Sequence, residues 1–174
     1  MSKSFEDLLS KVSECSLKKV AVAVAQDDAV LEAVQAAKER NIAEAILVGD
    51  ADKIKEVAAS MNMSLDGFEI IDEKDNYTAA LKAVELVHTG KADMYMKGLI
   101  DTKSFLKSVL DKEVGLRTGK TLSHVCVFEI EGIDHLLFLS DVAFLTYPSL
   151  EEKVHIIENT VDVCHACGIP NPKV

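Results

Sequence analysis

The chain has 174 residues, with 29 acidic against 19 basic side chains and a net charge of −10. Its 48% hydrophobic and 28% charged residues are typical of a folded globular protein and exclude a disordered chain. The acidic balance argues against nucleic acid or an anionic membrane as a partner, but it allows a small anion to bind in a locally basic cleft.

The sequence predicts a cytoplasmic protein. Its longest apolar runs have the length of strands, so no transmembrane helix is expected. Acidic residues appear within the first seven positions, and this segment lacks the apolar core of a signal peptide. The four cysteines, at positions 15, 126, 164 and 167, do not have the spacing of a disulfide scaffold and indicate a reducing compartment.

Strands and helices are predicted to alternate through the first part of the chain. Strands are expected at 18–25, 45–48, 68–71 and 94–96. The helices that follow begin at Asp27 or Asp28, span 52–61 and 75–88, and begin at Asp101 or Thr102. The inward-facing residues of the last two are expected to be Leu81, Val84 and Val87, then Phe105, Leu106, Val109 and Leu110. This order predicts a parallel sheet with helices on both faces and ligands bound at the carboxyl ends of the strands.

The pattern changes after residue 118. Two apolar runs, 125–130 and 136–139, are separated by a short turn and predict an antiparallel hairpin. A long helix is expected from Ser149 to about Cys167, with Val154, Ile157, Val161 and Cys164 facing inward. We therefore expect an α/β domain at 1–118 and the beginning of a second domain at 119–174.

The segment from Lys97 to Lys107 is the strongest local signal. Gly98 is expected to make a tight turn with positive φ, and the helix start at Asp101 or Thr102 would leave backbone N–H groups open. With Lys97, Lys103 and Lys107 nearby, this pattern is typical of a phosphate site. The alternative is an ordinary strand-to-helix turn with solvated lysines.

Other motifs are weaker. The segment 164–167 (Cys-His-Ala-Cys) lacks a second Cys/His pair nearby, so no metal is expected. Ser123, His124 and Asp141 could be read as a hydrolase triad, but no Gly-x-Ser-x-Gly elbow is present. No dinucleotide or Walker glycine fingerprint is found either. Two polar clusters therefore remain, at 121–124 and 140–143.

Taken together, these segments resemble the phosphate acetyltransferase/phosphate butyryltransferase family, and the butyryl branch more closely. The specific matches are 96–102, 116–118, 123–124, 140–143 and 168–174. The resemblance implies reversible transfer of an acyl group between coenzyme A and phosphate. The partners would be acyl-CoA and phosphate or acyl phosphate, with coenzyme A as a substrate and no tightly bound cofactor. It also implies a two-domain fold similar to isocitrate and isopropylmalate dehydrogenases, with the active site in the interdomain cleft, and assembly into oligomers.

The resemblance also assigns roles to residues. Lys97, Gly98 and Thr102 would line the phosphate end, and His124 belongs to a substrate-binding segment. The catalytic residues would be Lys107, which stands where the acetyl branch has arginine, together with Ser123 and Asp141 from the second domain. Family members are longer than this chain, and their C-terminal part carries the principal coenzyme A contacts. The 174-residue chain alone is therefore expected to be inactive.

Two other functions remain open. The chain could be a non-catalytic domain that binds a small phosphorylated anion or a partner subunit, or a nicotinamide-dependent relative of the dehydrogenases. A homo-oligomer is expected in either the enzymatic or the interaction role, because the hairpin edge and the apolar face of the last helix would otherwise be uncovered.

Overall fold

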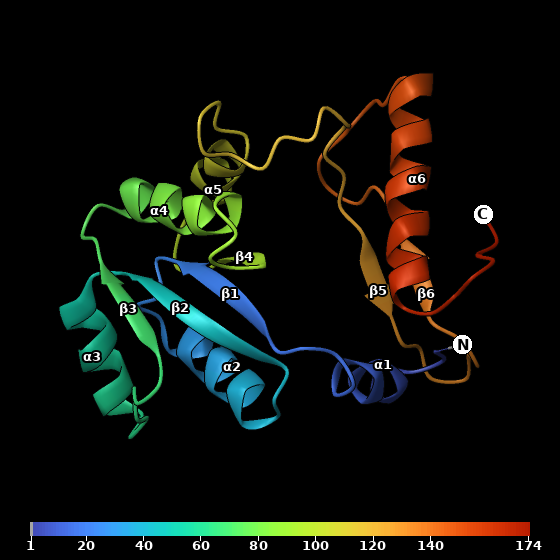
Figure 1. Ribbon diagram of the computed structural model, residues 1–174. Coiled ribbons are helices and arrows are strands. Elements are labelled where there is room, and N and C mark those ends of the chain that lie inside the picture. Colours follow the sequence, from blue (N-terminus) through green and yellow to red (C-terminus); the bar gives the residue numbers. More distant parts are fainter. Residues whose placement is uncertain (1) are drawn as a thin grey trace. The chain divides into compact units, whose positions relative to one another are not determined.

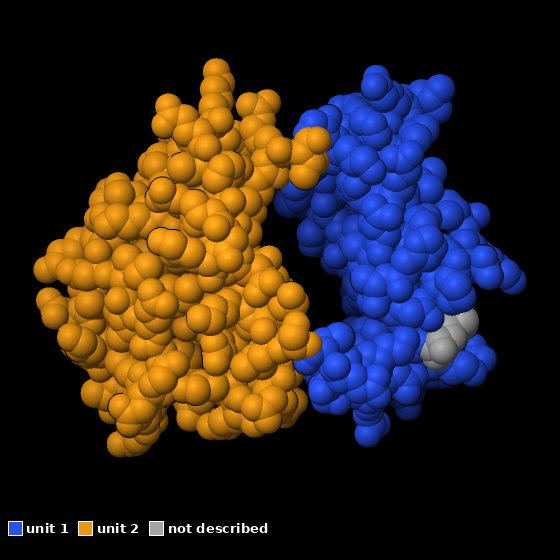
Figure 2. Space-filling view, viewed as in Figure 1, with its two compact units in different colours: residues 1–15, 119–174 blue, residues 16–118 orange. Residues whose placement is uncertain are grey.

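The computed structural model describes residues 2–174, and Met1 lies outside the described residues. The chain divides into two compact units, which Figure 2 shows in different colours. Unit 2 is Ser16–Thr118, and unit 1 combines the residues up to Cys15 with Gly119–Val174. The two units meet in the sequence between residues 118 and 119. The first fifteen residues, however, group with unit 1 rather than with the unit that follows them in sequence.

Unit 2 is built on a four-stranded parallel sheet with strand order β3-β2-β1-β4. Its strands are β1 (Lys18–Ala23), β2 (Ala43–Gly49), β3 (Glu69–Asp72) and β4 (Met94–Lys97). Its helices are α2 (Asp28–Glu39), α3 (Ala51–Ser60), α4 (Asn76–His88) and α5 (Thr102–Val109). These elements confirm the predicted α/β fold with a parallel sheet and flanking helices.

Each face of this sheet has its own hydrophobic core. Alternate residues of a strand point to opposite faces, so β1 and β2 contribute to both cores. Ala21, Ala23 and Val48 pack with the alanines of α4, whereas Val22 and Leu47 pack with residues of α2 and α3. Figure 1 shows α2 and α3 on one face, with α4 and α5 on the other. This double burial explains the continuous apolar run of β1.

Aspartate caps begin all four helices of unit 2. The carboxylates of Asp27, Asp50, Asp75 and Asp101 each accept a hydrogen bond from a backbone N–H group in the first turn of the helix that follows. Such caps satisfy donors that have no partner within the helix. Local sequence therefore determines where these helices begin.

The inward faces of α4 and α5 differ in part from the expected ones. The buried face of α4 consists mainly of alanines, and Leu81 is only half-buried. Small side chains let this helix lie close to the sheet. The prediction that Leu110 faces inward is wrong, because Leu110 is the C-cap of α5 and is 47% exposed. Ser108 is fully buried on that helix instead.

Unit 1 contains α1 (Phe5–Val12), β5 (Cys126–Phe128), β6 (Leu137–Leu139) and α6 (Leu150–Ala166). Strands β5 and β6 pair antiparallel, as the hairpin prediction required. A capping box of Ser149 and Glu152 begins α6. Helix α1 was not expected from the sequence. Its first N–H, from Phe5, donates to Glu129 Oε2 at 2.7 Å, and Lys11 Nζ donates to the Cys167 carbonyl at 3.4 Å.

Helix α6 leaves part of its apolar face uncovered within unit 1. Ile156 and Cys164 are buried, but Val154 and Ile157 are 46% and 43% exposed, so the inward assignment of these two is wrong. A cavity of about 520 Å³ lies against this helix and is lined by Phe138, Ile157 and Cys164, among other residues. Among the described residues, no helix is both long and apolar enough to cross a membrane.

Candidate functional site

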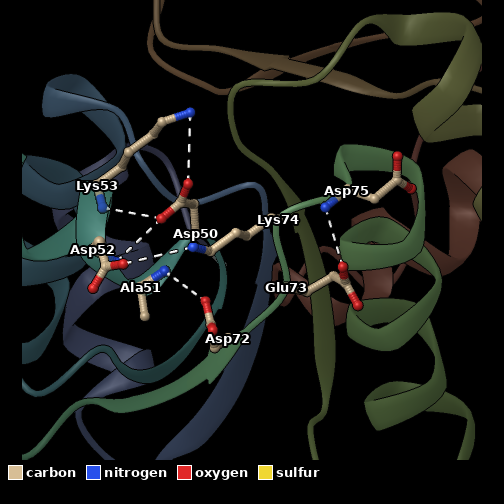
Figure 3. Close-up of polar contacts among 8 residues, drawn as sticks. All are labelled: Asp50, Ala51, Asp52, Lys53, Asp72, Glu73, Lys74 and Asp75. Carbon is tan, nitrogen blue, oxygen red and sulfur yellow. Dashed lines mark hydrogen bonds and ion pairs between the residues drawn. The ribbon is translucent and has the colours of Figure 1, made fainter.

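The carboxyl edge of the parallel sheet is acidic where β2 and β3 end. Figure 3 shows that carboxylates at this edge accept hydrogen bonds from neighbouring backbone N–H groups. Asp72 Oδ1 accepts a hydrogen bond from the Ala51 N–H at 3.0 Å, and Asp50 Oδ1 accepts from the Asp52 and Lys53 N–H groups at 3.2 Å each. The Lys53 N–H is the largest cause that lowers the pKa of Asp50. This half of the edge is therefore committed to capping α3 and carries negative charge.

The other half of the edge contains the topological switch point. From β1, the chain proceeds to β2 and β3 on one side, while β4 pairs with β1 on the other side. In open α/β sheets, ligands bind in the crevice where the strand order reverses. Here the strand order reverses between β1 and β4, which end at Ala23 and Lys97, and these two residues are register partners.

Gly98 follows β4 at this switch point and is required for its close approach to β1. The Gly98 N–H donates to the Ala23 carbonyl and the Leu99 N–H to the Val24 carbonyl, both at 2.8 Å. A Cβ atom at position 98 would lie only 2.4 Å from the Val24 carbonyl oxygen. The expectation of a positive φ is wrong, because Gly98 is not among the glycines with positive φ in the described chain. Contact between two backbones requires glycine here.

The turn after Gly98 satisfies several of its own backbone N–H groups. Besides the Gly98 and Leu99 donors, the Ile100 N–H donates to the Gly98 carbonyl at 2.9 Å, and the Ser104 N–H donates to Asp101 Oδ1 at 2.9 Å. Hydrogen bonds from the Ser104 side chain and backbone lower the pKa of Asp101. The N-terminus of α5 thus already holds the Asp101 carboxylate, which weakens the attraction of this terminus for a second anion.

Three lysine side chains at the end of β4 and on α5 could bind an anion. Lys97 ends β4, while Lys103 and Lys107 lie on α5, and all three are exposed, as is Thr102. Within residues 2–174, none of the three lysines has a carboxylate oxygen within 4.0 Å, although six other lysines of the described chain do. The edge is therefore acidic at β2 and β3 and basic at β4 and α5, which favours an anion at the basic end.

Helix α5 is anchored to β4 by contacts that the sequence analysis did not find. The Tyr95 ring of β4 stacks on Phe105 with centroids 4.8 Å apart, and its hydroxyl lies 2.8 Å from Ser108 Oγ. Burial raises the pKa of Tyr95, so the hydroxyl stays protonated at neutral pH. Ser108, which lies within the apolar stripe of α5, is the feature of the sequence that could have indicated this contact, because a buried hydroxyl needs a hydrogen-bond partner.

Two further residues at the switch point were also missed. Val24 is fully buried and has φ 57°, a backbone conformation that is strained for a β-branched residue and recurs at functional sites. Gln26, two residues later, has its Oε1 buried without a hydrogen-bond partner in the described chain. A Cβ at Gly49 would lie 2.1 Å from this oxygen, so the Gln26 amide packs directly against Gly49.

Unit 1 brings the predicted residues Ser123, His124 and Asp141 together. Asp141 Oδ1 accepts a hydrogen bond from the His124 N–H at 2.8 Å, and Oδ2 accepts from the Phe144 and Leu145 N–H groups at 3.1 and 2.7 Å. Burial acts to raise the pKa of Asp141, but these backbone donors outweigh it and lower the pKa. Asp141 is therefore an anion whose two oxygens hold the backbone of the neighbouring segments.

The Ser123 hydroxyl accepts a hydrogen bond from a residue of α6. Asn159 Nδ2 donates to Ser123 Oγ at 2.9 Å and to the Thr121 carbonyl at 3.0 Å, so the Ser123 hydroxyl proton can be donated elsewhere. The backbone of His124, not its ring, contacts Asp141, and the ring lies against Phe144 with centroids 5.7 Å apart. This geometry does not form a Ser-His-Asp triad.

The predicted site residues thus form two local groups. Lys97, Gly98, Thr102 and Lys107 belong to unit 2, whereas the group of Ser123, His124 and Asp141 belongs to unit 1. In the part of the chain that the structure describes, no three His, Cys, Asp or Glu side chains gather in a way that could hold a metal ion.

Comparison with known proteins defines the class to which this fold and these groups belong. The chain is 62% identical over 174 residues to phosphate butyryltransferase of Clostridium acetobutylicum and 60% identical to that of Clostridium beijerinckii. Both alignments cover 100% of this chain and 58% of the relative. A branched-chain phosphotransacylase from Enterococcus faecalis superposes with a TM-score of 0.68 at 27% identity, covering 86% of this chain and 51% of that one. The profile of the phosphate acetyl/butaryl transferase family matches residues 4–82 and 75–174.

The chain belongs to the phosphate acetyl/butaryl transferase family. This confirms the resemblance that the sequence motifs indicated. The chain spans a little more than half the length of the curated relatives that it matches.

Proposed function

We propose that this protein transfers a short-chain acyl group reversibly between coenzyme A and inorganic phosphate, as a phosphate butyryltransferase-like enzyme. The observation that carries the proposal is the set of three exposed lysines at the end of β4 and on α5, namely Lys97, Lys103 and Lys107. None of them has a carboxylate within 4.0 Å among residues 2–174. In a chain with net charge −10, unneutralised lysines at this edge provide a place for a phosphate group.

In the proposed reaction, a phosphate oxygen attacks the thioester carbonyl, the new C–O bond forms and the C–S bond breaks. Coenzyme A leaves as the thiolate and takes up the proton that the attacking hydrogen phosphate loses, which gives the free thiol. It acts as a substrate rather than as a tightly bound cofactor. Lys97 and Thr102 would hold the phosphoryl oxygens, and Lys107 would add positive charge. The Ser123 hydroxyl, oriented by Asn159, would donate to the developing oxyanion. Asp141 would fix the backbone that presents Ser123 and His124.

The finer features of the proposal follow from the family resemblance. They are a dehydrogenase-like arrangement of two domains with the substrate cleft between them, a cytoplasmic location and a homo-oligomer. The second candidate function is a domain that binds a small anion or a subunit without catalysis. The observation that favours it is the exposed apolar surface of α6 and the hairpin, which suits contact with a subunit. Phosphate binding is common to both functions, whereas acyl phosphate formation from acyl-CoA and phosphate separates them.

Inorganic phosphate is expected to stabilise the chain against heat. A ligand that binds only the folded state raises the unfolding free energy by about 2.7 kcal/mol at a concentration 100 times its Kd. Lys97→Ala should remove most of this gain. Lys55→Ala changes an exposed lysine of α3 and should not remove this gain. Thermal melts in phosphate and in chloride of equal ionic strength measure both effects. Equal shifts in the two salts would contradict the phosphate site.

The chain is expected to self-associate through unit 1. Leu137, Leu139 and Ile157 are each more than 40% exposed, and the hairpin has unpaired strand edges. Ile157→Glu should therefore shift the population towards monomer in light scattering, whereas Lys153→Glu, an exposed position on the same helix, should leave it unchanged. A wild-type chain that stays monomeric at high micromolar concentration would contradict this expectation.

A further inference from the structure

Lys107 lies against an aromatic ring at the basic end of the sheet edge. Its Nζ atom is 4.3 Å from the centroid of the Tyr77 ring. An ammonium within about 6 Å of an aromatic centroid is attracted by the negative face of the ring. Tyr77 belongs to the first turn of α4, which begins where β3 ends, so the ring lies at the carboxyl edge of the sheet.

The Lys107 side chain is directed towards the same edge. Side chains on an α-helix lean towards its N-terminus. The N-terminus of α5 follows the Lys97–Gly98 turn, so a side chain that leans this way approaches the switch point. Tyr77 therefore holds the ammonium at the ligand-binding end of α5, which in turn is anchored to β4 by Tyr95 and Ser108.

The ring attracts the ammonium without neutralising it. No carboxylate of the described chain lies within 4.0 Å of Lys107 Nζ. The charge of Lys107 acts on the pKa of Asp111, which lies one turn further along the chain. Its pKa is lowered first by the Val114 and Glu113 N–H groups, and only last by the charge of Lys107. Asp111 is thus occupied by backbone donors, and Lys107 keeps its charge available for an anion.

We propose that Tyr77 is a positioning residue that holds Lys107 for the phosphoryl group of the substrate; this inference rests on the proposed function. A lysine ammonium is a point charge on a flexible stem, and ordering it costs side-chain entropy. A ring that restricts this stem before the ligand arrives reduces the cost of binding. Tyr77 acts through Lys107 and does not itself contact the ligand.

The test measures the Kd of inorganic phosphate for variants of this chain by thermal shift. Tyr77→Leu removes the ring and should weaken phosphate binding about 2–5-fold, the equivalent of a cation–π contact of about 0.5–1 kcal/mol. Tyr77→Phe keeps the ring and should bind within about twofold of wild type. In a Lys107→Met background, Tyr77→Leu should have no further effect on the Kd, because the cation on which the ring acts is gone.

A matched control exists within the same unit. Lys38 Nζ also lies 4.3 Å from a ring centroid, that of Phe68, on the opposite face of the sheet. Phe68→Leu removes a comparable ring and should leave the phosphate Kd unchanged. Weakening by Phe68→Leu equal to that by Tyr77→Leu, or an undiminished Tyr77→Leu effect in Lys107→Met, would overturn the positioning role. If Tyr77→Leu does not fold, Tyr77→Phe still tests the proposal. A folded Tyr77→Phe variant that binds phosphate as weakly as Lys107→Met would also contradict the positioning role. Absence of phosphate binding by wild type would instead refute the proposed function.

Discussion

Replacing Gly98 with alanine is expected to shift urea unfolding of unit 2 to a clearly lower concentration. The new Cβ would lie 2.4 Å from the Val24 carbonyl oxygen and 2.5 Å from that of Ala23, and both atoms belong to the backbone at the end of the central strand. No side-chain rotation relieves such a contact, so β4 must move away from β1. This movement stretches the hydrogen bonds from Gly98 and Leu99 to β1. We expect a loss of about 3 kcal/mol from overpacking and weakened backbone hydrogen bonds.

Gly90→Ala provides the control for this variant. Gly90 ends the helix before β4 and has φ 74°, but a Cβ there meets nothing within 4 Å. Its replacement strains the backbone by about 1–2 kcal/mol without any clash. Circular dichroism in urea should therefore give the order wild type, Gly90→Ala, Gly98→Ala, from most to least stable. A Gly98→Ala chain as stable as Gly90→Ala would show that β4 can separate from β1 at little cost.

Signals that act within a few residues made most of the fold predictable. The run of small apolar residues in β1 indicated a strand buried on both faces, and Asp27, Asp75 and Asp101 cap helices where the sequence placed helix starts. The hairpin and the start of α6 at Ser149 were also correct. Caps and alternation are local features, and the structure retains them because the tertiary contacts agree with them.

Features that depend on distant contacts could not be predicted. Helix α1 has no buried residue, and its recorded anchors, Glu129 and the Cys167 carbonyl, are far away in sequence. The reason for Gly98 lies in the carbonyls of β1 and not in its own φ.

In the candidate site, too, local features could be predicted from the sequence, whereas contacts between distant residues could not. The sequence located its lysines, because charge is visible in a sequence. That the Ala23 and Val24 carbonyls and the Asp101 carboxylate already accept hydrogen bonds from the Gly98, Leu99 and Ser104 N–H groups becomes visible only in the fold. The Tyr77 ring beneath Lys107 is also a tertiary contact.

Asp141→Asn is expected to destabilise unit 1 and to change its dependence on pH. The Asp141 carboxylate accepts three backbone hydrogen bonds, from His124, Phe144 and Leu145. An amide presents an NH₂ group where one oxygen stood, so at least one backbone donor loses its acceptor and all lose the charge. Charge-assisted bonds of this kind are among the stronger ones, and we expect a loss of about 2–4 kcal/mol at neutral pH. Hydrogen exchange of the three amides should accelerate, whereas Asp162→Asn, at an exposed position of α6, should leave it unchanged.

The sign of the pH effect follows from the lowered pKa of Asp141. A carboxyl group whose folded pKa lies below its unfolded value of about 3.8 stabilises the folded chain above that value. This contribution is lost as the pH falls through the folded pKa, when the carboxylate becomes protonated. The difference in unfolding free energy between wild type and Asp141→Asn should therefore be largest near neutral pH and shrink below about pH 4. A difference that stays constant from pH 7 to pH 3 would show that the carboxylate charge does not hold these amides, and would leave Asp141 free for the direct catalytic role that the family resemblance assigns to it.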